Sequence, residues 1–339
     1  MSLYDELPQV YGTGEILSDG RTDWKKEKLR SNAVSVVMPT EKRQERMAEC
    51  SSFLEFASDL KGNKRLHRAN FCKDRMCPAC QRRRSLKVFH QIKDVCTALM
   101  RERPSTCFLM LTLTVPNIHK DDLSETISHM FKSWDRLTKR AEFRKPVIGW
   151  FRSLEITAEK SSRDGYFHPH FHVLIAVPSY YFKTKAYIKQ SRWLELWQEA
   201  TRQPEITQVD VRRVKPSKKR LAAGAVETNP EGGSSFDSVV SAAAEVGKYA
   251  TKPGDYLARV NSDLYLANES IVSVLAEALK GRKIIAFGGE FKKILAALGS
   301  DDVDSESTDL VHVGDQESDI DAVIIQIFRW HSSHNNYIG

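Results

Sequence analysis

Two histidines, His170 and His172, flank one phenylalanine at the start of the apolar run from Phe171 to Val177. Such a run predicts a buried strand, and side chains two residues apart on a strand point to the same face of the sheet. Two imidazoles on one face can share one metal ion. A lone histidine is more often structural, but this pair favours metal binding and constrains the chain to a fold that contains a sheet.

The composition limits the class of protein. A chain of 339 residues can form one main domain with appendages. No apolar stretch approaches the roughly 20 residues that a membrane span needs, and the N-terminus lacks the pattern of a signal peptide. We therefore expect a soluble, cytoplasmic protein without a membrane partner. In that reducing compartment the six cysteines favour metal binding or catalysis over disulfides.

Charge is distributed unevenly along the chain. Between Asp301 and Asp321 there are nine acidic residues and no Lys or Arg, so the rest of the chain carries +16 rather than the overall +7. A basic chain can simply be soluble, but this asymmetry indicates a polyanionic partner such as nucleic acid. Basic runs near the cysteines and after residue 210 look like phosphate-contacting surfaces. To them we assign the DNA-binding residues Arg75, Arg82, Arg83, Arg84, Arg212 and Arg213.

Hydrophobic periodicity predicts an alternating series of strands and helices. The strands are expected at 107–115, 150–157, 171–177 and 206–214, and amphipathic helices at 127–137 and 187–197. The order β-α-β-β-α-β is that of an α+β, ferredoxin-like or RRM-like antiparallel sheet, with helices on one face and an open face that can take a nucleic acid. Further helices are expected from about 239 to 252, at 272–278 and at 291–298. The acidic segment then reads as a solvated linker before an apolar run at 322–328.

Glu155 is the candidate third ligand. If the second and third strands pair, Glu155 lies beside the histidine strand. A site of two histidines and one carboxylate with open positions suits Mn²⁺ or Mg²⁺ on phosphate oxygens, and imidazole ligation favours Mn²⁺. His168 is an alternative candidate ligand, because on a strand it would point to the same face as His170 and His172.

Glu245 and Tyr249 are four residues apart and would share one face of a helix. The phenolic oxygen of Tyr249 can attack a phosphodiester, forming a covalent phosphotyrosine and freeing a 3′-hydroxyl. Lys248 and Lys252 can lower the pKa of the phenol or hold the phosphate, and Glu245 can act as a base for a second acceptor such as water. A tyrosine picked at random from this chain would more often be a packing residue than a nucleophile. Tyr256 would join this face only if the helix continued through it.

Three cysteines, Cys72, Cys77 and Cys80, have the spacing of zinc ligands in a basic stretch. We choose Cys50 as the fourth ligand, with His67 second, because four thiolates suit a structural Zn²⁺. Free buried thiols are the alternative reading, since Cys77 and Cys80 also form a CxxC redox pattern.

Three segments in this order resemble the motifs of rolling-circle replication initiators from small plasmids of Gram-positive bacteria, which belong to the HUH endonuclease superfamily. They are FLMLTLT at 108–114, HPHFHVLIAV at 168–177 and EVGKYATK at 245–252, and the resemblance also includes CKDRMCPACQRRRS at 72–85. It covers about 50–257. It implies that Tyr249 is the nicking nucleophile, that His170 and His172 hold the metal, and that Glu245 activates water for the terminating hydrolysis.

The resemblance implies a site-specific, metal-dependent nickase that opens a plasmid origin, remains on the 5′ end and leaves a 3′-hydroxyl primer. The expected segments are an N-terminal arm with little core (1–44), a basic zinc module (45–104), an HUH nickase domain (105–270) and C-terminal helices with the acidic segment (271–339). Expected partners are double- and single-stranded origin DNA and, by family, a host helicase; a homodimer is left open. The competing readings are a relaxase or single-tyrosine transposase, and a zinc-dependent DNA-binding regulator that never cuts.

Overall fold

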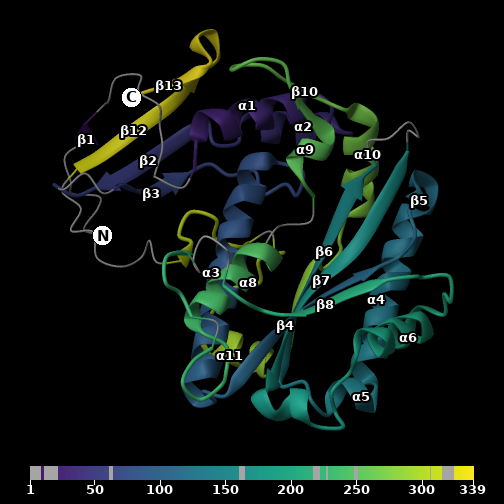
Figure 1. The fold of residues 1–339 in the computed structure, drawn as a ribbon. Coiled ribbons are helices and arrows are strands. Elements are labelled where there is room, and N and C mark those ends of the chain that lie inside the picture. The colour runs from purple at the N-terminus through teal and green to yellow at the C-terminus, as the bar shows by residue number, and fades with distance from the viewer. Residues whose placement is uncertain are drawn as a thin grey trace. The chain divides into compact units, whose positions relative to one another are not determined.

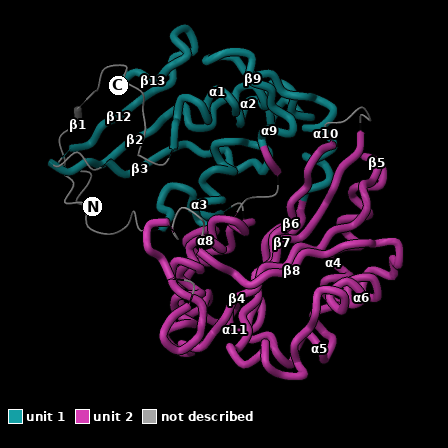
Figure 2. Tube along the Cα trace, in the orientation of Figure 1, with its two compact units in different colours: residues 1–87, 253–280, 306–339 teal, residues 88–252, 281–305 magenta. Residues whose placement is uncertain are grey.

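A computed structural model of the chain describes residues 9–10, 22–60, 64–159, 165–216, 222–226, 228–247, 251–305, 307–314 and 324–339. The protein is α+β, with largely antiparallel sheets and helices. It divides into two compact units, each built from segments distant in sequence: unit 1 combines 1–87, 253–280 and 306–339, and unit 2 combines 88–252 and 281–305 (Figure 2). Among the described residues, no helix is both long and apolar enough to cross a membrane.

The sheet of unit 2 has the predicted order of elements. Its strands are β4 (Thr106–Thr114), β5 (Ile118–His119), β6 (Gly149–Ala158), β7 (Tyr166–Pro178), β8 (Val209–Arg213) and β11 (Ile285–Gly289). They pair antiparallel in the order β11-β6-β7-β4-β8, with β5 on β7. Helix α4 (Leu123–Lys139) follows β4, the short α5 (Ala141–Arg144) follows α4, and α6 (Gln190–Thr201) follows β7. The β-α-β-β-α-β order is therefore confirmed, and β11 is an additional edge strand that the sequence pattern did not predict.

Aromatic side chains fix α4 and α6 to one face of this sheet. The Phe171 ring on β7 lies 5.6 Å from Phe131 and 6.3 Å from Trp134 of α4, and 6.3 Å from Trp197 of α6. The guanidinium of Arg152 lies 4.7 Å from the Phe171 ring centre, so the apolar layer also buries one cation. These contacts help to hold β7, and therefore the histidines, in position.

Helices α8 (Phe236–Val246) and α11 (Glu290–Ala297) lie on the other side of the sheet (Figure 1). The Ser153 hydroxyl of β6 donates to the Val246 carbonyl at 3.2 Å, and Phe108 of β4 lies 6.4 Å from Phe291 of α11. The expectation of an open second face is therefore wrong where these helices pack, because apolar side chains such as Phe108 point to that face as well.

Helix α8 ends earlier than predicted. It stops at Val246 with Gly247 as its C-cap, whereas the pattern predicted a helix to Lys252, which lies outside any helix. A Cβ on Gly247 would lie 2.6 Å from the Ala243 carbonyl oxygen and 3.3 Å from the backbone of Phe89. Glycine is thus required for this close approach and is a usual helix terminator.

Unit 1 is built around a second sheet. Its strands are β1 (Gln9–Val10), β12 (Ile324–His331), β2 (Phe53–Ser58) and β3 (Lys64–Ala69) in that order, with β13 (Asn336–Ile338) on β12. Helices α1 (Trp24–Ser35), α2 (Glu41–Ala48), α9 (Pro253–Tyr256) and α10 (Glu269–Ala278), the hairpin β9 (Leu257–Arg259) and β10 (Tyr265–Ala267), and the start of α3 (Pro78–Glu102) complete it. Trp24 is fully buried against Phe56 and Phe71, so part of the expected N-terminal arm contributes to a core.

Part of the acidic segment packs within unit 1. Leu310 and Val313 are buried. The guanidinium of Arg83 donates to the Leu310 carbonyl at 2.8 Å, and the Lys87 ammonium donates to the Asp309 carbonyl at 2.9 Å. The expectation of a solvated linker is wrong for these residues, because their carbonyl groups satisfy buried cations.

Candidate metal centres and active site

His170 and His172 meet Glu155 on one side of the unit 2 sheet. The Nε2 atoms of the two imidazoles lie 3.1 Å apart. Strands β6 and β7 pair with Glu155 opposite His170, which puts the carboxylate on the same face. Its Oε2 atom lies 2.9 Å from Nε2 of His172 and 3.7 Å from Nε2 of His170. All three side chains thus offer ligand atoms within 4.8 Å of one another, as a shared metal ion requires.

The donor set fits a divalent ion. Nδ1 of His170 lies 3.3 Å from the His168 carbonyl oxygen, which can only accept, so the Nε2 lone pair of His170 points into the cluster. Two adjacent ligands at right angles on an ion with bonds of about 2.1 Å lie about 3 Å apart, close to the separation of the two imidazoles. Two nitrogens and one carboxylate oxygen suit several transition ions, so the donor set does not by itself identify the metal.

Glu155 is held as a carboxylate despite its burial. Only 2% of its side chain is exposed. Burial alone would raise the pKa of Glu155, but its contacts with His170, His172 and Lys252 outweigh burial and hold the pKa well below its usual range. Lys252 forms an ion pair with Glu155. The cluster therefore contains a negative charge that a cation can neutralise.

His168 lies beside the cluster and not in it. Its Nδ1 atom is 2.8 Å from the Asn117 side-chain oxygen and its Nε2 atom is 2.9 Å from the Thr114 hydroxyl, so both ring nitrogens have partners. Burial lowers the pKa of His168. With His170, Thr114 and Asp210 of β8, it lines a hollow of about 350 Å³ next to the cluster, where part of a substrate could sit.

Glu245 and the residues after it are only partly described. Glu245 lies in the last turn of α8 and forms an ion pair with Arg212 of β8. Lys248 and Tyr249 lie outside the described residues. The described residues on either side contact β6: the Val246 carbonyl accepts from β6, and Thr251 forms a parallel bridge with Ile156, next to Glu155. Tyr256 lies in unit 1, where its side chain is buried.

The basic residues assigned to DNA have different environments. Arg83 and Arg84 have exposed fractions of 0% and 1%, and Arg84 donates to the Lys73 carbonyl at 2.7 Å. Assigning them to DNA is wrong for this structure, because backbone oxygens already bind both guanidinium groups. Arg75 donates to the Leu279 carbonyl at 2.8 Å, whereas Arg82 is exposed.

On β8 the two arginines are also engaged. Arg212 is bound to Glu245, as described above, and lies 3.7 Å from Asp210. Arg213 lies over the Phe182 ring at 5.2 Å and donates to the Gly232 carbonyl at 3.3 Å. DNA phosphates would have to compete with these partners.

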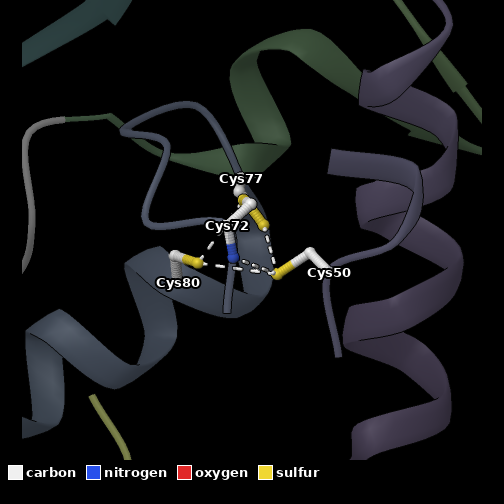
Figure 3. Close-up of side chains that lie close together, drawn as sticks. All are labelled: Cys50, Cys72, Cys77 and Cys80. Carbon is white, nitrogen blue, oxygen red and sulfur yellow. Dashed lines mark hydrogen bonds between the residues drawn. The ribbon is translucent and has the colours of Figure 1, made fainter. Parts of the chain in front are cut away.

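Four thiols form a second cluster, in unit 1 (Figure 3). Cys50 lies 3.6 Å from Cys80 and 3.5 Å from Cys77, and Cys72 lies 3.7 Å from Cys80. Four thiolates at about 2.3 Å from one Zn²⁺ would be about 3.8 Å apart, so the cluster fits a tetrahedral ion. Of the two candidates for the fourth ligand, Cys50 is in the cluster, whereas His67 is paired with Glu55. All four cysteines are buried and free of disulfides.

Lys28 of α1 is a neighbour of this cluster that the sequence pattern did not reveal. Lys28 is 1% exposed, and its ammonium group donates to the Cys50 carbonyl at 2.9 Å and to the Ala48 carbonyl. Burial lowers the pKa of Lys28. One lysine among many on a helix carries no sequence signal for such a position.

Comparisons with known proteins identify the family. The family model described as "Replication protein" matches residues 63–338. The chain belongs to this family of replication proteins. A relative named "Protein rep" from Bacillus amyloliquefaciens is 32% identical over 99% of this chain and 97% of the relative. Another "Protein rep", from Streptococcus pneumoniae serotype 2, is 32% identical over 86% of this chain and 83% of the relative. A "Protein rep" from Bacillus sp is 34% identical over 88% of this chain and 94% of the relative. Membership of the replication protein family confirms the resemblance to replication initiators.

Proposed function

We propose that this replication protein is a site-specific DNA nickase and strand transferase that starts and ends rolling-circle replication at a plasmid's double-strand origin. The convergence of His170, His172 and Glu155 on one side of an antiparallel sheet is the observation that carries the proposal. Within it, unit 2 has the HUH endonuclease fold, the cluster holds Mn²⁺ or Mg²⁺, and the four cysteines hold a structural Zn²⁺. The partners are origin DNA and a host helicase, in the cytoplasm.

In the proposed cleavage, the phenolic oxygen of Tyr249 attacks the scissile phosphorus. A bond from that oxygen to phosphorus forms at the 5′ end, the bond to the 3′ oxygen breaks, and the 3′ oxygen takes a proton to become the primer hydroxyl. The phenolic proton is lost to solvent, and Lys248 and Lys252 stabilise the phenolate and the phosphate. A divalent ion bound by the cluster would supply Lewis-acid stabilisation of the phosphate oxygens.

Termination needs a different acceptor. Glu245 is proposed to take a proton from water, which then attacks the phosphorus of the phosphotyrosine and releases the tyrosine. Its ion pair with Arg212 of β8 would orient the carboxylate until DNA is bound. A nickase with one tyrosine and one glutamate can therefore end a round by hydrolysis, whereas a tyrosine alone would continue strand transfer.

The proposal is tested by incubating the protein and Mn²⁺ with supercoiled plasmid that carries the chain's own origin. The measured quantity is the fraction of plasmid converted into nicked circles. The wild type is expected to nick, and a His170→Ala/His172→Ala variant with unchanged folding is expected to lose nicking. If the wild type binds this origin but leaves every circle supercoiled, the zinc-dependent regulator becomes the better account. If the protein ends the reaction by joining the cut strand to a second DNA molecule and does not release it by hydrolysis, a relaxase or transposase would be favoured.

A further inference from the structure

A second surface of unit 2 lies at the end of β7 that is distant from the histidines. Strand β7 runs from Tyr166 to Pro178, so its end is roughly 26 Å from His170 at about 3.3 Å per residue. The 3-10 turn η3 (Ser179–Lys183) follows immediately and leads toward α6. This surface is therefore separate from the candidate metal centre.

Two exposed tyrosines stand on a firmly packed loop. Tyr180 is 65% exposed and Tyr187 is 45% exposed. The ring of Tyr187 lies 5.4 Å from Tyr181 and 6.1 Å from Phe182. Tyr181 is buried, and its hydroxyl accepts from the Ile188 amide at 2.9 Å. The loop thus holds its inner aromatic rings in place and leaves two outer rings with surface available for stacking.

Three lysines lie on or beside this loop. Lys145, Lys183 and Lys185 are exposed, and none of the three has an ion-pair partner among the residues that the structure describes. Two carboxylates nearby are already paired: Glu142 with Arg192 at 2.8 Å, and Glu290 with Lys293 at 2.9 Å. No described acidic residue therefore pairs with these three lysines, and Glu142 and Glu290, which line the hollows described next, each already pair with another cation.

The two exposed tyrosines, Lys145 and Lys185 line two adjoining hollows, and Lys183 lies on the neighbouring turn η3. One, of about 600 Å³, is lined by Arg103, Lys145 and Tyr180 among others. The other, of about 400 Å³, is lined by Lys145, Lys185 and Tyr187 among others. Both include Lys145 and Pro146, so the two hollows adjoin there and together make a candidate path, with Tyr180 lining the first hollow and Tyr187 the second.

We infer that this path binds single-stranded DNA, with bases stacked on Tyr180 and Tyr187 and phosphates held by Lys145, Lys183 and Lys185. Stacking rings beside a basic groove are the combination by which proteins hold single strands, because unpaired bases offer their faces and the backbone offers its charge. The bases of an intact duplex are stacked on one another and cannot use such rings. The choice of DNA as the polyanion rests on the proposed function. This surface would give the proposed nickase a second contact with single-stranded DNA, away from the candidate metal centre.

The test is the affinity of the full chain for a fluorescein-labelled oligothymidylate of about 16 nucleotides, measured by anisotropy without added Mn²⁺ or Mg²⁺. Tyr180→Ala/Tyr187→Ala is expected to raise Kd about tenfold or more. Tyr180→Phe/Tyr187→Phe keeps the rings and is expected to bind like the wild type. Unchanged affinity of the alanine variant, or a loss confined to a duplex of the same length, would overturn the inference.

The lysines are tested through salt dependence. Replacing Lys145, Lys183 and Lys185 by alanine removes three phosphate contacts, so the slope of log Kd against log salt concentration is expected to fall by about 2. Lys132→Ala, an exposed position on α4, is the matched control and should leave the slope almost unchanged. An unchanged slope in the triple variant would contradict the assignment.

The two proposals fail separately. If the alanine variant of the tyrosines loses oligothymidylate binding while the wild type never nicks origin DNA, the proposed function fails and the surface stands. If the wild type nicks origin DNA and the alanine variant binds oligothymidylate like the wild type, only the surface fails.

Discussion

Glu155 on β6 and His172 on β7 are joined across the sheet by a contact of 2.9 Å between Oε2 and Nε2. The two residues are 17 positions apart in the sequence, and the antiparallel pairing of their strands brings them together. This contact links the fold of unit 2 to its chemistry, because any slip of one residue in the register would move one of the two side chains to the opposite face.

Replacing Glu155 by glutamine is expected to weaken Mn²⁺ binding to unit 2 by at least about tenfold, because the neutral amide keeps the shape but removes the charge that attracts the ion. Mn²⁺ affinity is measured by electron paramagnetic resonance. Glu159→Gln makes the same change at an exposed residue nearby and should bind Mn²⁺ like the wild type. Equal affinities of the two variants would exclude Glu155 as a ligand.

Cys80→Ser is expected to reduce bound zinc from about one ion per chain to a small fraction and to lower the stability of unit 1, because three thiolates bind Zn²⁺ less tightly than four. Zinc is counted by native mass spectrometry, and unfolding is followed by heating with and without a chelator. Cys96→Ser is the control, because it also replaces a buried thiol by a hydroxyl but lies outside the cluster, so it should leave the zinc content unchanged. Full zinc content in Cys80→Ser would contradict the zinc assignment.

Gly149→Ala is expected to destabilise unit 2 by about 1–3 kcal/mol, the usual cost of overpacking. A Cβ at Gly149 would lie 2.6 Å from the Phe291 ring and 2.8 Å from its backbone nitrogen, where β6 meets the start of α11. Gly254→Ala, where a Cβ would meet nothing within 4 Å, is the matched control. Urea unfolding measures both; a Gly149 variant as stable as the control would show that α11 can move away without cost.

The sequence predicted the parts of the site that depend on local pattern. Alternation around His170 and His172 placed both imidazoles on one face, and the strand order placed Glu155 beside them. Cysteine spacing identified Cys72, Cys77 and Cys80, and the preference of a structural zinc ion for four thiolates led to Cys50, which is in the cluster.

Other features depend on contacts between distant segments, which periodicity does not contain. Strand β11 pairs Ile285 with Ser153, more than a hundred residues earlier, so its local sequence gave no sign of that neighbour. The sequence predicted a surface position for Arg83. The carbonyl groups that accept its hydrogen bonds, such as that of Leu310, are more than 200 residues away in the sequence and could not be foreseen. Helix α8 ends at Gly247, where the backbone of Phe89 leaves little room for a side chain, and a helical pattern does not show such a contact.

The most direct test of the account is to incubate the wild type and Tyr249→Phe with 5′- and 3′-labelled single-stranded origin DNA and Mn²⁺, followed by denaturing electrophoresis. The wild type is expected to give a covalent adduct with the 5′ end of the downstream fragment and a free 3′-hydroxyl on the upstream fragment. The phenylalanine variant should bind the DNA and give neither product. An adduct of equal yield in Tyr249→Phe, or bound but uncut DNA in the wild type, would contradict the tyrosine nickase account.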